Sequence, residues 1–223
     1  FETRSMPNPW IWTYCMRWPD CLLLFLLLPH PVPAANEAYQ ELYRSHDVPK
    51  ELHRGAVPVC FHHGCDSVSR VALSDQNWHT VVRHLAVRAE SAAAERQQIR
   101  QAIAEMERVI GRLAGTSGDR AGDIAGFTTL QPQMDCVDES ANTTAYLSLF
   151  EQSGLLHWHT VEPRERRGFL FFGGWPHYTA MIREKETGQR WAVDSWFRDN
   201  GELPDVMELS IWKDGWRPEG FVF

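Results

Sequence analysis

The chain has 223 residues with 29 acidic and 22 basic side chains, which gives a formal net charge of −7. An acidic chain of this kind lacks the basic surface that nucleic-acid binding needs, so we expect no nucleic-acid partner. Hydrophobic residues make up 43% of the sequence, enough at this length for one domain with a substantial core, which we place at residues 35–223.

A short apolar run near the N-terminus predicts export. Met16 and the arginine after it precede the run 21–28, which is too short to span a bilayer. Val32-Pro33-Ala34 then supplies the small residues of a cleavage site. We expect residues 1–34 to be an upstream extension and a signal peptide starting at Met16, cleaved after Ala34 or Ala35. The mature chain is then periplasmic or secreted and not stably inserted in a membrane, with an uncleaved membrane anchor as the alternative.

Two cysteines lie close together in the N-terminal segment 35–74. Cys60 and Cys65 enclose four residues, and an oxidising compartment favours a disulfide between them. The alternative is a metal site that also uses His62 and His63. Ligands this close together rarely wrap one zinc ion well, and the usual ligand spacing is absent. We therefore favour the disulfide and expect no metal and no cofactor.

The segment 75–114 predicts one long helix. From Asp75 to Leu113 there is no proline, and Gly111 is the sole glycine. Its apolar residues recur at alternating spacings of three and four, with Arg96 breaking the series: Trp78, Val82, Leu85, Ala89, Ala92, Ile99, Ile103, Met106, Ile110 and Leu113. Because alanines dominate the middle of this seam, we expect the helix to dock on the chain's own core. A homodimer through the same helix is the alternative.

A cysteine follows at the predicted start of another helix. Asp135 is a good N-cap residue, and Asp138 completes a near capping box. Helical spacing then continues from Cys136 to Gln152, and Gly154 stops it. The free N–H groups and the positive dipole end of a helix stabilise a thiolate at this position.

A β-hairpin is predicted downstream, with strands at 177–184 and 189–197 joined by a polar turn that ends in Gly188. If Glu184 faces Gln189, then His177 and Asp194 lie on the same face as diagonal neighbours, close enough for their side chains to meet. A register slip of one residue would place them on opposite faces.

These segments resemble a known superfamily. His177-Tyr178-Thr179-Ala180 and the stretch from Gly188 to Ser195 look like the His-strand and Asp-strand of the transglutaminase-like superfamily. Cys136-Val137-Asp138 is similar to the cysteine motif of bacterial transglutaminase-like cysteine peptidases. The resemblance covers roughly residues 125–200. It implies an α+β fold over 115–223, with a papain-like core of a helix packed on an antiparallel sheet, preceded by the long helix.

The resemblance also implies roles for individual residues. Cys136 is the expected nucleophile, His177 the general base and acid, and Asp194 the carboxylate that orients the imidazole. Gln131 and Gln133 both lie near the cysteine as candidates for support of an oxyanion hole, and Gln131 is the nearer match in spacing. Two tryptophans flank the site as candidate walls of a substrate cleft, Trp175 and Trp196.

The expected function is therefore that of an exported thiol acyl-transfer enzyme acting on amide bonds of a peptide or protein substrate. Transfer of the acyl group to water gives a peptidase or amidase, and transfer to an amine gives a transglutaminase. The alternative is a non-catalytic peptide-binding protein of the cell envelope that keeps a degenerate transglutaminase-like fold. A third option is a small metal-binding protein built around residues 60–65.

Overall fold

The computed structural model of the protein describes residues 37–124, 133–168 and 176–221. All of these belong to one compact unit, Pro33–Phe223. The expected leader at 1–34 lies outside the described residues, as do Gln131 and Trp175.

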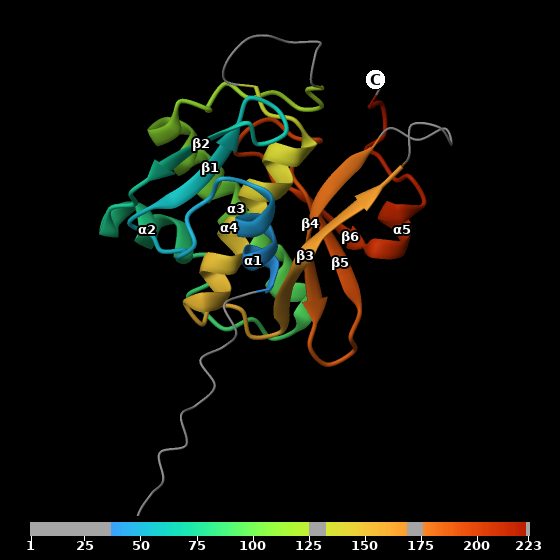
Figure 1. Ribbon diagram of the computed structural model, residues 1–223. Coiled ribbons are helices and arrows are strands. Elements are labelled where there is room, and N and C mark those ends of the chain that lie inside the picture. The colour runs from blue at the N-terminus through green and yellow to red at the C-terminus, as the bar shows by residue number, and fades with distance from the viewer. Residues whose placement is uncertain (1–36, 125–132, 169–175, 222–223) are drawn as a thin grey trace, which may run out of the picture. The chain divides into compact units, whose positions relative to one another are not determined.

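Helices and antiparallel strands make up this unit, which confirms the predicted α+β class (Figure 1). In chain order the elements are α1 (Glu37–Ser45), β1 (Val57–Phe61), β2 (Ser67–Val71), α2 (Asp75–Val82), α3 (Ala92–Ala114), α4 (Cys136–Gln152), β3 (His159–Arg167), β4 (His177–Glu184), β5 (Arg190–Asp194), β6 (Asp205–Glu208) and α5 (Leu209–Lys213). Strands β1 and β2 pair with each other, and β3 to β6 form a second sheet in sequential order.

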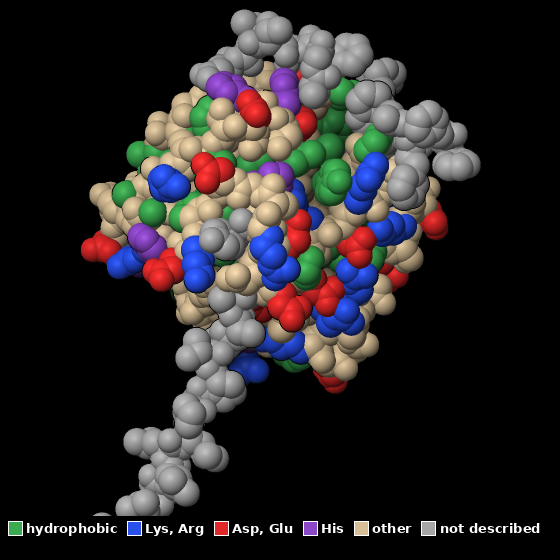
Figure 2. Space-filling model, viewed as in Figure 1, with side chains coloured by type: hydrophobic (Ala, Val, Ile, Leu, Met, Phe, Trp, Pro, Cys, Tyr) green, Lys and Arg blue, Asp and Glu red, His purple; other side chains and the backbone are tan. Residues whose placement is uncertain are grey.

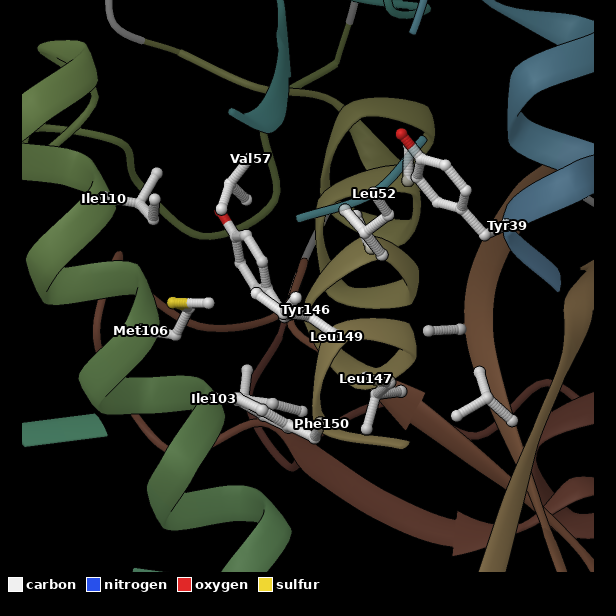
Figure 3. Packing of buried hydrophobic residues seen from close by; sticks show 14 of the residues in the cluster. Tyr39, Leu52, Val57, Ile103, Met106, Ile110, Tyr146, Leu147, Leu149 and Phe150 are labelled. Atoms are coloured by element: carbon white, nitrogen blue, oxygen red, sulfur yellow. The ribbon is translucent and has the colours of Figure 1, made fainter. Parts of the chain in front are cut away.

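Helix α4 lies between the two sheets and packs against strands of both (Figure 1). Helix α3 covers another side of it, where Ile103 and Met106 face the α4 residues Tyr146 and Phe150 (Figure 3). Nearly every residue of α4 is buried as a result. The helix that begins at Cys136 is therefore the centre of the fold, with contacts on all sides holding its position.

The prediction of a single long helix over 75–114 is wrong. The chain forms two helices here, and residues 83–91 connect them. Ser91 starts the second helix, because its hydroxyl accepts a hydrogen bond from the Ala94 N–H at 3.2 Å. Serine is among the strongest N-cap residues, and its N-cap signal lies within the apolar pattern that predicted one helix.

Tertiary contacts keep the connecting residues 83–91 out of a continuous helix. The Val87 carbonyl accepts from the Gln98 carboxamide at 2.9 Å, and the Ala89 carbonyl accepts from the Trp158 indole at 2.9 Å. These carbonyls would accept backbone hydrogen bonds in a continuous helix, and here they accept from side chains instead. The later part of the apolar seam, from Ile99 to Ile110, is buried in the chain's own core, which confirms the expected docking.

The β4–β5 hairpin has the predicted register. Ala180 pairs with Val193 and Met181 with Ala192, the same offset as the predicted pairing of Glu184 with Gln189. Strand β4 has the predicted bounds, whereas β5 ends at Asp194, three residues before the predicted end. Residues 195–198 turn away from the sheet instead, with the Arg198 N–H donating to the Ser195 carbonyl at 2.9 Å.

Acidic and basic side chains alternate on the visible face of the larger sheet (Figure 2). Glu162 accepts hydrogen bonds from Arg183 and Arg190, and Glu165 accepts from Arg190 and Lys213. Partly exposed ion pairs of this kind each contribute at most about 1 kcal/mol to stability. Their main effect is to keep this face of the sheet polar.

Three buried carboxyl groups lie close to one another inside the fold. Burial raises the pKa of Glu107 to about 7 and that of Asp119 to about 7. Burial, together with the nearby charges of Glu107 and Asp119, raises the pKa of Glu139 well above its usual range. Asp119 and Glu139 also share a hydrogen bond. The folded protein therefore retains protons here at a pH where the unfolded chain has lost them.

We expect the free energy of unfolding to fall as the pH rises from about 4 to about 7. The raised pKa values mean that the folded state binds more protons than the unfolded state in this window, so their contribution is full below it and lost above it. Burial also raises the pKa of Asp138 to about 7, which adds to the effect. Urea unfolding across this range should show a loss on the order of 2 kcal/mol.

Glu139→Gln should reduce that pH dependence, because an amide cannot take on the buried charge while the other carboxyl groups still titrate. Glu202→Gln, at an exposed acidic residue, should leave the dependence unchanged. A stability that is flat or increasing over this window in the unaltered protein would contradict the raised pKa values of these buried carboxyl groups.

Candidate active site

Cys136 occupies the first turn of α4, and the predicted capping box around it is confirmed. One carboxylate oxygen of Asp135 accepts from the N–H groups of Val137 and Asp138, each at 3.0 Å. The Asp138 carboxylate in return accepts from the Asp135 N–H at 3.1 Å. The two acidic residues thus fix the backbone on both sides of the cysteine.

The thiol of Cys136 is buried, with 7% of the residue exposed. Its sulfur donates to the Pro176 carbonyl at 3.9 Å, so it lies beside the backbone at the start of β4. Burial raises the pKa of Cys136 to about 12, and the charges of Asp135 and Asp194 add to this effect. The Tyr178 N–H and the cysteine's own N–H oppose it. In this form Cys136 is a neutral thiol.

His177 begins β4 and Asp194 ends β5, and their side chains meet as the hairpin register predicts. The imidazole Nε2 and the carboxylate Oδ2 are 2.7 Å apart. An ionised carboxylate can only accept a hydrogen bond, so Nε2 carries a proton, and in the neutral imidazole the lone pair is on Nδ1. Among the described residues, the buried Nδ1 has no hydrogen-bond partner. A buried nitrogen left in this state is available to take a proton.

Asp194 is itself held by two tryptophans. The indole N–H of Trp212 donates to the same carboxylate oxygen that contacts His177, at 2.7 Å. The backbone N–H of Trp196 donates to the other oxygen at 3.3 Å. These bonds orient the carboxylate and give both of its oxygens a donor in a buried setting. Sequence reasoning missed Trp212, which comes from α5 and follows no local motif.

Aromatic rings enclose the imidazole. The ring of His177 lies 4.7 Å from that of Trp196, 5.2 Å from that of Phe197 and 5.5 Å from that of Trp212, measured between centroids. Cys136 packs in the same hydrophobic cluster as Trp196 and Phe197. The structure thus brings the predicted cysteine and histidine to one aromatic cluster. Trp196 lines it as a buried residue.

A half-buried arginine lies opposite the histidine. Arg167 on β3 pairs in register with His177 on β4. Its guanidinium is 4.5 Å from the centre of the Trp212 ring and donates to the carbonyls of Trp212 and Trp216. Sequence reasoning missed this residue as well. A positive charge here partly balances that of Asp194, whose charge in turn raises the pKa of Arg167 against the lowering caused by burial.

Of the two glutamines considered for the oxyanion hole, Gln133 lies among the described residues. Its carboxamide accepts from the Arg120 N–H at 3.1 Å and donates to the Gly118 carbonyl at 2.9 Å. These bonds brace the turn after α3. Because both ends of the carboxamide are bonded to that turn, Gln133 has a bracing role in this structure.

Cys60 and Cys65 form the predicted disulfide. Among the described cysteines, Cys136 alone stays a free thiol. The bridge uses both sulfurs that the alternative metal site would need, and the described residues contain no group of three or more His, Cys, Asp or Glu able to hold a metal ion.

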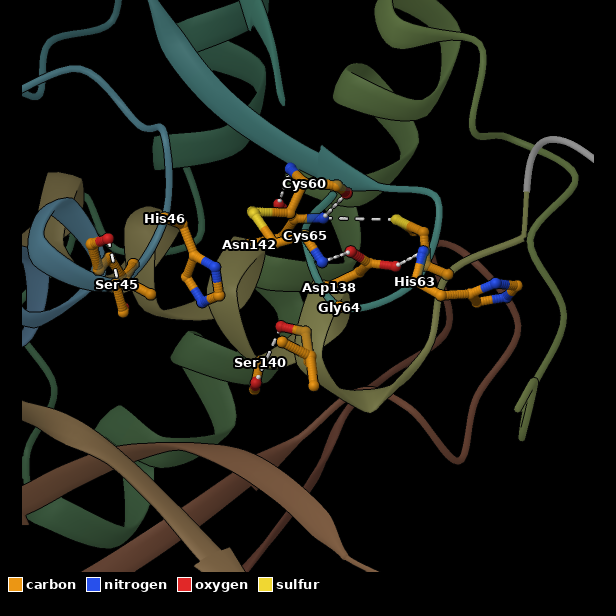
Figure 4. Close-up of a disulfide and its surroundings, with 12 residues drawn as sticks. Ser45, His46, Cys60, His63, Gly64, Cys65, Asp138, Ser140 and Asn142 are labelled. Atoms are coloured by element: carbon orange, nitrogen blue, oxygen red, sulfur yellow. Dashed lines mark hydrogen bonds between the residues drawn. A yellow bond between two sulfur atoms is a disulfide. The ribbon is translucent and has the colours of Figure 1, made fainter. Parts of the chain in front are cut away.

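The disulfide closes a loop of unusual backbone. His62, His63 and Cys65 have φ angles of 67°, 59° and 60°, and Gly64 between them has 67°. The left-handed region costs a residue with a side chain roughly 1–2 kcal/mol. Figure 4 shows the loop lying over the start of α4, where its N–H groups point at the carboxylate of Asp138.

No helix in the described part of the chain is both long enough and apolar enough to cross a membrane. No protein-family model, no curated protein and no solved structure matches this chain.

Proposed function

We propose that this protein is a thiol acyl-transfer enzyme that acts on amide bonds of a peptide or protein through a thioester on Cys136. The observation that carries the proposal is the His177–Asp194 pair, because Asp194 engages Nε2 at 2.7 Å while the buried Nδ1 has no partner among the described residues. This leaves one ring nitrogen free to act as a base in the residue after Pro176, whose carbonyl accepts from the Cys136 thiol.

The chemistry follows from the neutral thiol. Nδ1 of His177 accepts the thiol proton while the sulfur attacks the amide carbonyl, and Asp194 stabilises the imidazolium that forms. The imidazolium then protonates the leaving amine, the C–N bond breaks, and the acyl group remains on sulfur as a thioester. Water or a second amine attacks the thioester and releases the thiol, with His177 again passing the proton.

The finer fold belongs to the same proposal. A cysteine at the start of a central helix, with histidine and aspartate on adjacent antiparallel strands beside it, supports a papain-like core of the transglutaminase-like type. The apolar run after Met16 supports export to the periplasm or the exterior, where a disulfide such as Cys60–Cys65 persists.

A non-catalytic peptide-binding protein of the cell envelope is the second candidate. The observation in its favour is the pKa of Cys136, which burial raises to about 12. A thiolate is therefore not present in advance, and only proton transfer to His177 during the attack makes this cysteine reactive at neutral pH.

We expect the rate at which p-nitrophenyl acetate acylates Cys136 to level off above neutral pH. If Nδ1 removes the thiol proton, the rate stops rising once the imidazole is fully neutral. A thiol of pKa about 12 acting alone instead gives a rate that climbs throughout the alkaline range. Stopped-flow release of p-nitrophenolate measures the profile.

His177→Ala should convert the plateau into a continuous climb. His157→Ala serves as the matched control, since His157 is exposed and should keep the plateau. The same climb in the unaltered protein would refute the enzyme and leave the binding protein standing. Labelled casein then separates the two acyl acceptors, since hydrolysis releases fragments and transamidation incorporates dansylcadaverine.

A further inference from the structure

The disulfide loop holds both acidic residues of the capping box around Cys136. Asp138 accepts from the N–H of His63 at 2.8 Å with one oxygen and from the N–H of Cys65 at 2.7 Å with the other. Asp135 accepts from the N–H of Gly64 at 2.9 Å. Three successive amides of the loop are therefore bonded to the two side chains that fix the first turn of α4.

We propose that the Cys60–Cys65 loop is a positioning clamp for Cys136, so that opening the disulfide slows acylation of the thiol while the protein remains folded. The inference rests on the proposed function and adds regulation of the same site. Asp135 and Asp138 are positioning residues in this scheme, because they act on the cysteine through the helix backbone.

The backbone of the loop explains why the covalent bond matters. Four successive residues from His62 to Cys65 have positive φ, a conformation that only glycine adopts readily. The disulfide restricts the loop to this shape, and the shape turns the three N–H groups toward the carboxylates. Without the bridge, the non-glycine residues relax toward negative φ and the N–H groups turn away. Asp135 and Asp138 then lose donors in a buried setting, and the first turn of α4 loosens.

The loop also reaches the histidine side of the site. Nε2 of His63 lies 2.6 Å from the Asp123 carboxylate, and the Asp123 carbonyl accepts from the Trp196 indole at 2.8 Å. The Trp196 ring in turn packs on His177. One loop thus contacts the elements that place the cysteine and those that enclose its base. Its release is expected to disturb their relative position.

The chemistry of opening is ordinary thiol–disulfide exchange. A dithiol reductant attacks one sulfur of the bridge as a thiolate, passes through a mixed disulfide, and leaves as a cyclic disulfide. Cys60 and Cys65 gain two electrons and two protons and become thiols, while Cys136 is unchanged. Reduction normally protects a thiol enzyme, so inactivation by a reductant is a distinctive result.

The test compares the oxidised protein with the dithiothreitol-reduced protein and with the double variant Cys60→Ser, Cys65→Ser. Acylation by p-nitrophenyl acetate is followed as a function of concentration and pH, with amide hydrogen exchange over Val137–Glu139 and the circular dichroism spectrum. We expect the limiting acylation rate to fall roughly 10- to 100-fold with little change in the half-saturating concentration. Exchange at the first turn of α4 should rise while the spectrum stays that of a folded protein.

Asp138→Asn keeps the disulfide and weakens the contact with the loop, so it tests the clamp if the double variant does not fold. Asp66→Asn is its matched control, since Asp66 is an exposed carboxylate next to the bridge. A slower acylation rate in Asp138→Asn and an unchanged rate in Asp66→Asn support the clamp.

An open loop in folded protein with the original acylation rate, or with unchanged exchange at the start of α4, would overturn the clamp and leave the proposed function intact. An oxidised, unaltered protein whose Cys136 never becomes acylated would refute the proposed function instead. The exchange measurement then still decides whether the loop holds the helix.

Discussion

We expect Cys136→Ala to abolish formation of the acyl-enzyme, and His177→Ala to lower its rate by about 10²- to 10⁴-fold, the usual contribution of a positioned general acid and base. The two changes combined should cost little more than Cys136→Ala alone, because residues that act as one unit are not additive. Mass spectrometry of the protein after exposure to p-nitrophenyl acetate measures the acyl group on sulfur directly.

Asp194→Asn should have a smaller effect than His177→Ala. An amide still contacts the imidazole, yet it does not stabilise the imidazolium and it can favour the wrong tautomer. Trp212→Phe should lie closer still to the unaltered protein, since it removes one of the donors that hold Asp194. A His177→Ala protein that is acylated at the original rate and remains folded would rule out His177 as the base.

Glu95→Ala should strongly destabilise the fold. Its carboxylate is 1% exposed and accepts from the backbone N–H groups of His157, Trp158 and His159, at 2.6 to 3.0 Å. It also contacts the buried Nδ1 of His159 at 2.8 Å. Removing it leaves these donors buried without an acceptor, and we expect a loss of about 3–5 kcal/mol.

Urea unfolding at constant pH measures this loss, and Glu90→Ala is the matched control. Glu90 is exposed and lies just before the same helix, so its replacement should change the free energy of unfolding by less than about 0.5 kcal/mol. Equal effects of the two changes would show that Glu95 does not hold the start of β3.

Local patterns predicted the parts of the site that depend on local rules. The capping residues around Cys136 placed the start of α4 correctly, because an N-cap is decided within four residues. The polar turn before Gln189 fixed the hairpin register, and the register alone brings His177 and Asp194 to one face. Spacing also placed the Cys60–Cys65 bridge.

Long-range contacts decided what the sequence left open. The break before Ser91 depends on Trp158 and Gln98, which bind carbonyls of the connection. The hydrogen bond from Trp212 to Asp194 joins α5 to β5, and no rule of sequence spacing relates these two residues. The raised pKa of Cys136 has the same origin, because burial outweighs the favourable helix terminus that the sequence suggested.

The burial of α4 on nearly all sides has a consequence for folding. Elements from most of the chain surround this helix, and its own polar and apolar residues form no single stripe that one neighbour can cover. It therefore depends on contacts distant in sequence, which form late in a topological search. Until then Cys136 is on a solvated segment with the ordinary acidity of a cysteine. It can therefore form a non-native disulfide with Cys60 or Cys65. Refolding under oxidising conditions should pass through species mispaired at Cys136, and closing the short 60–65 loop first is the route that avoids them.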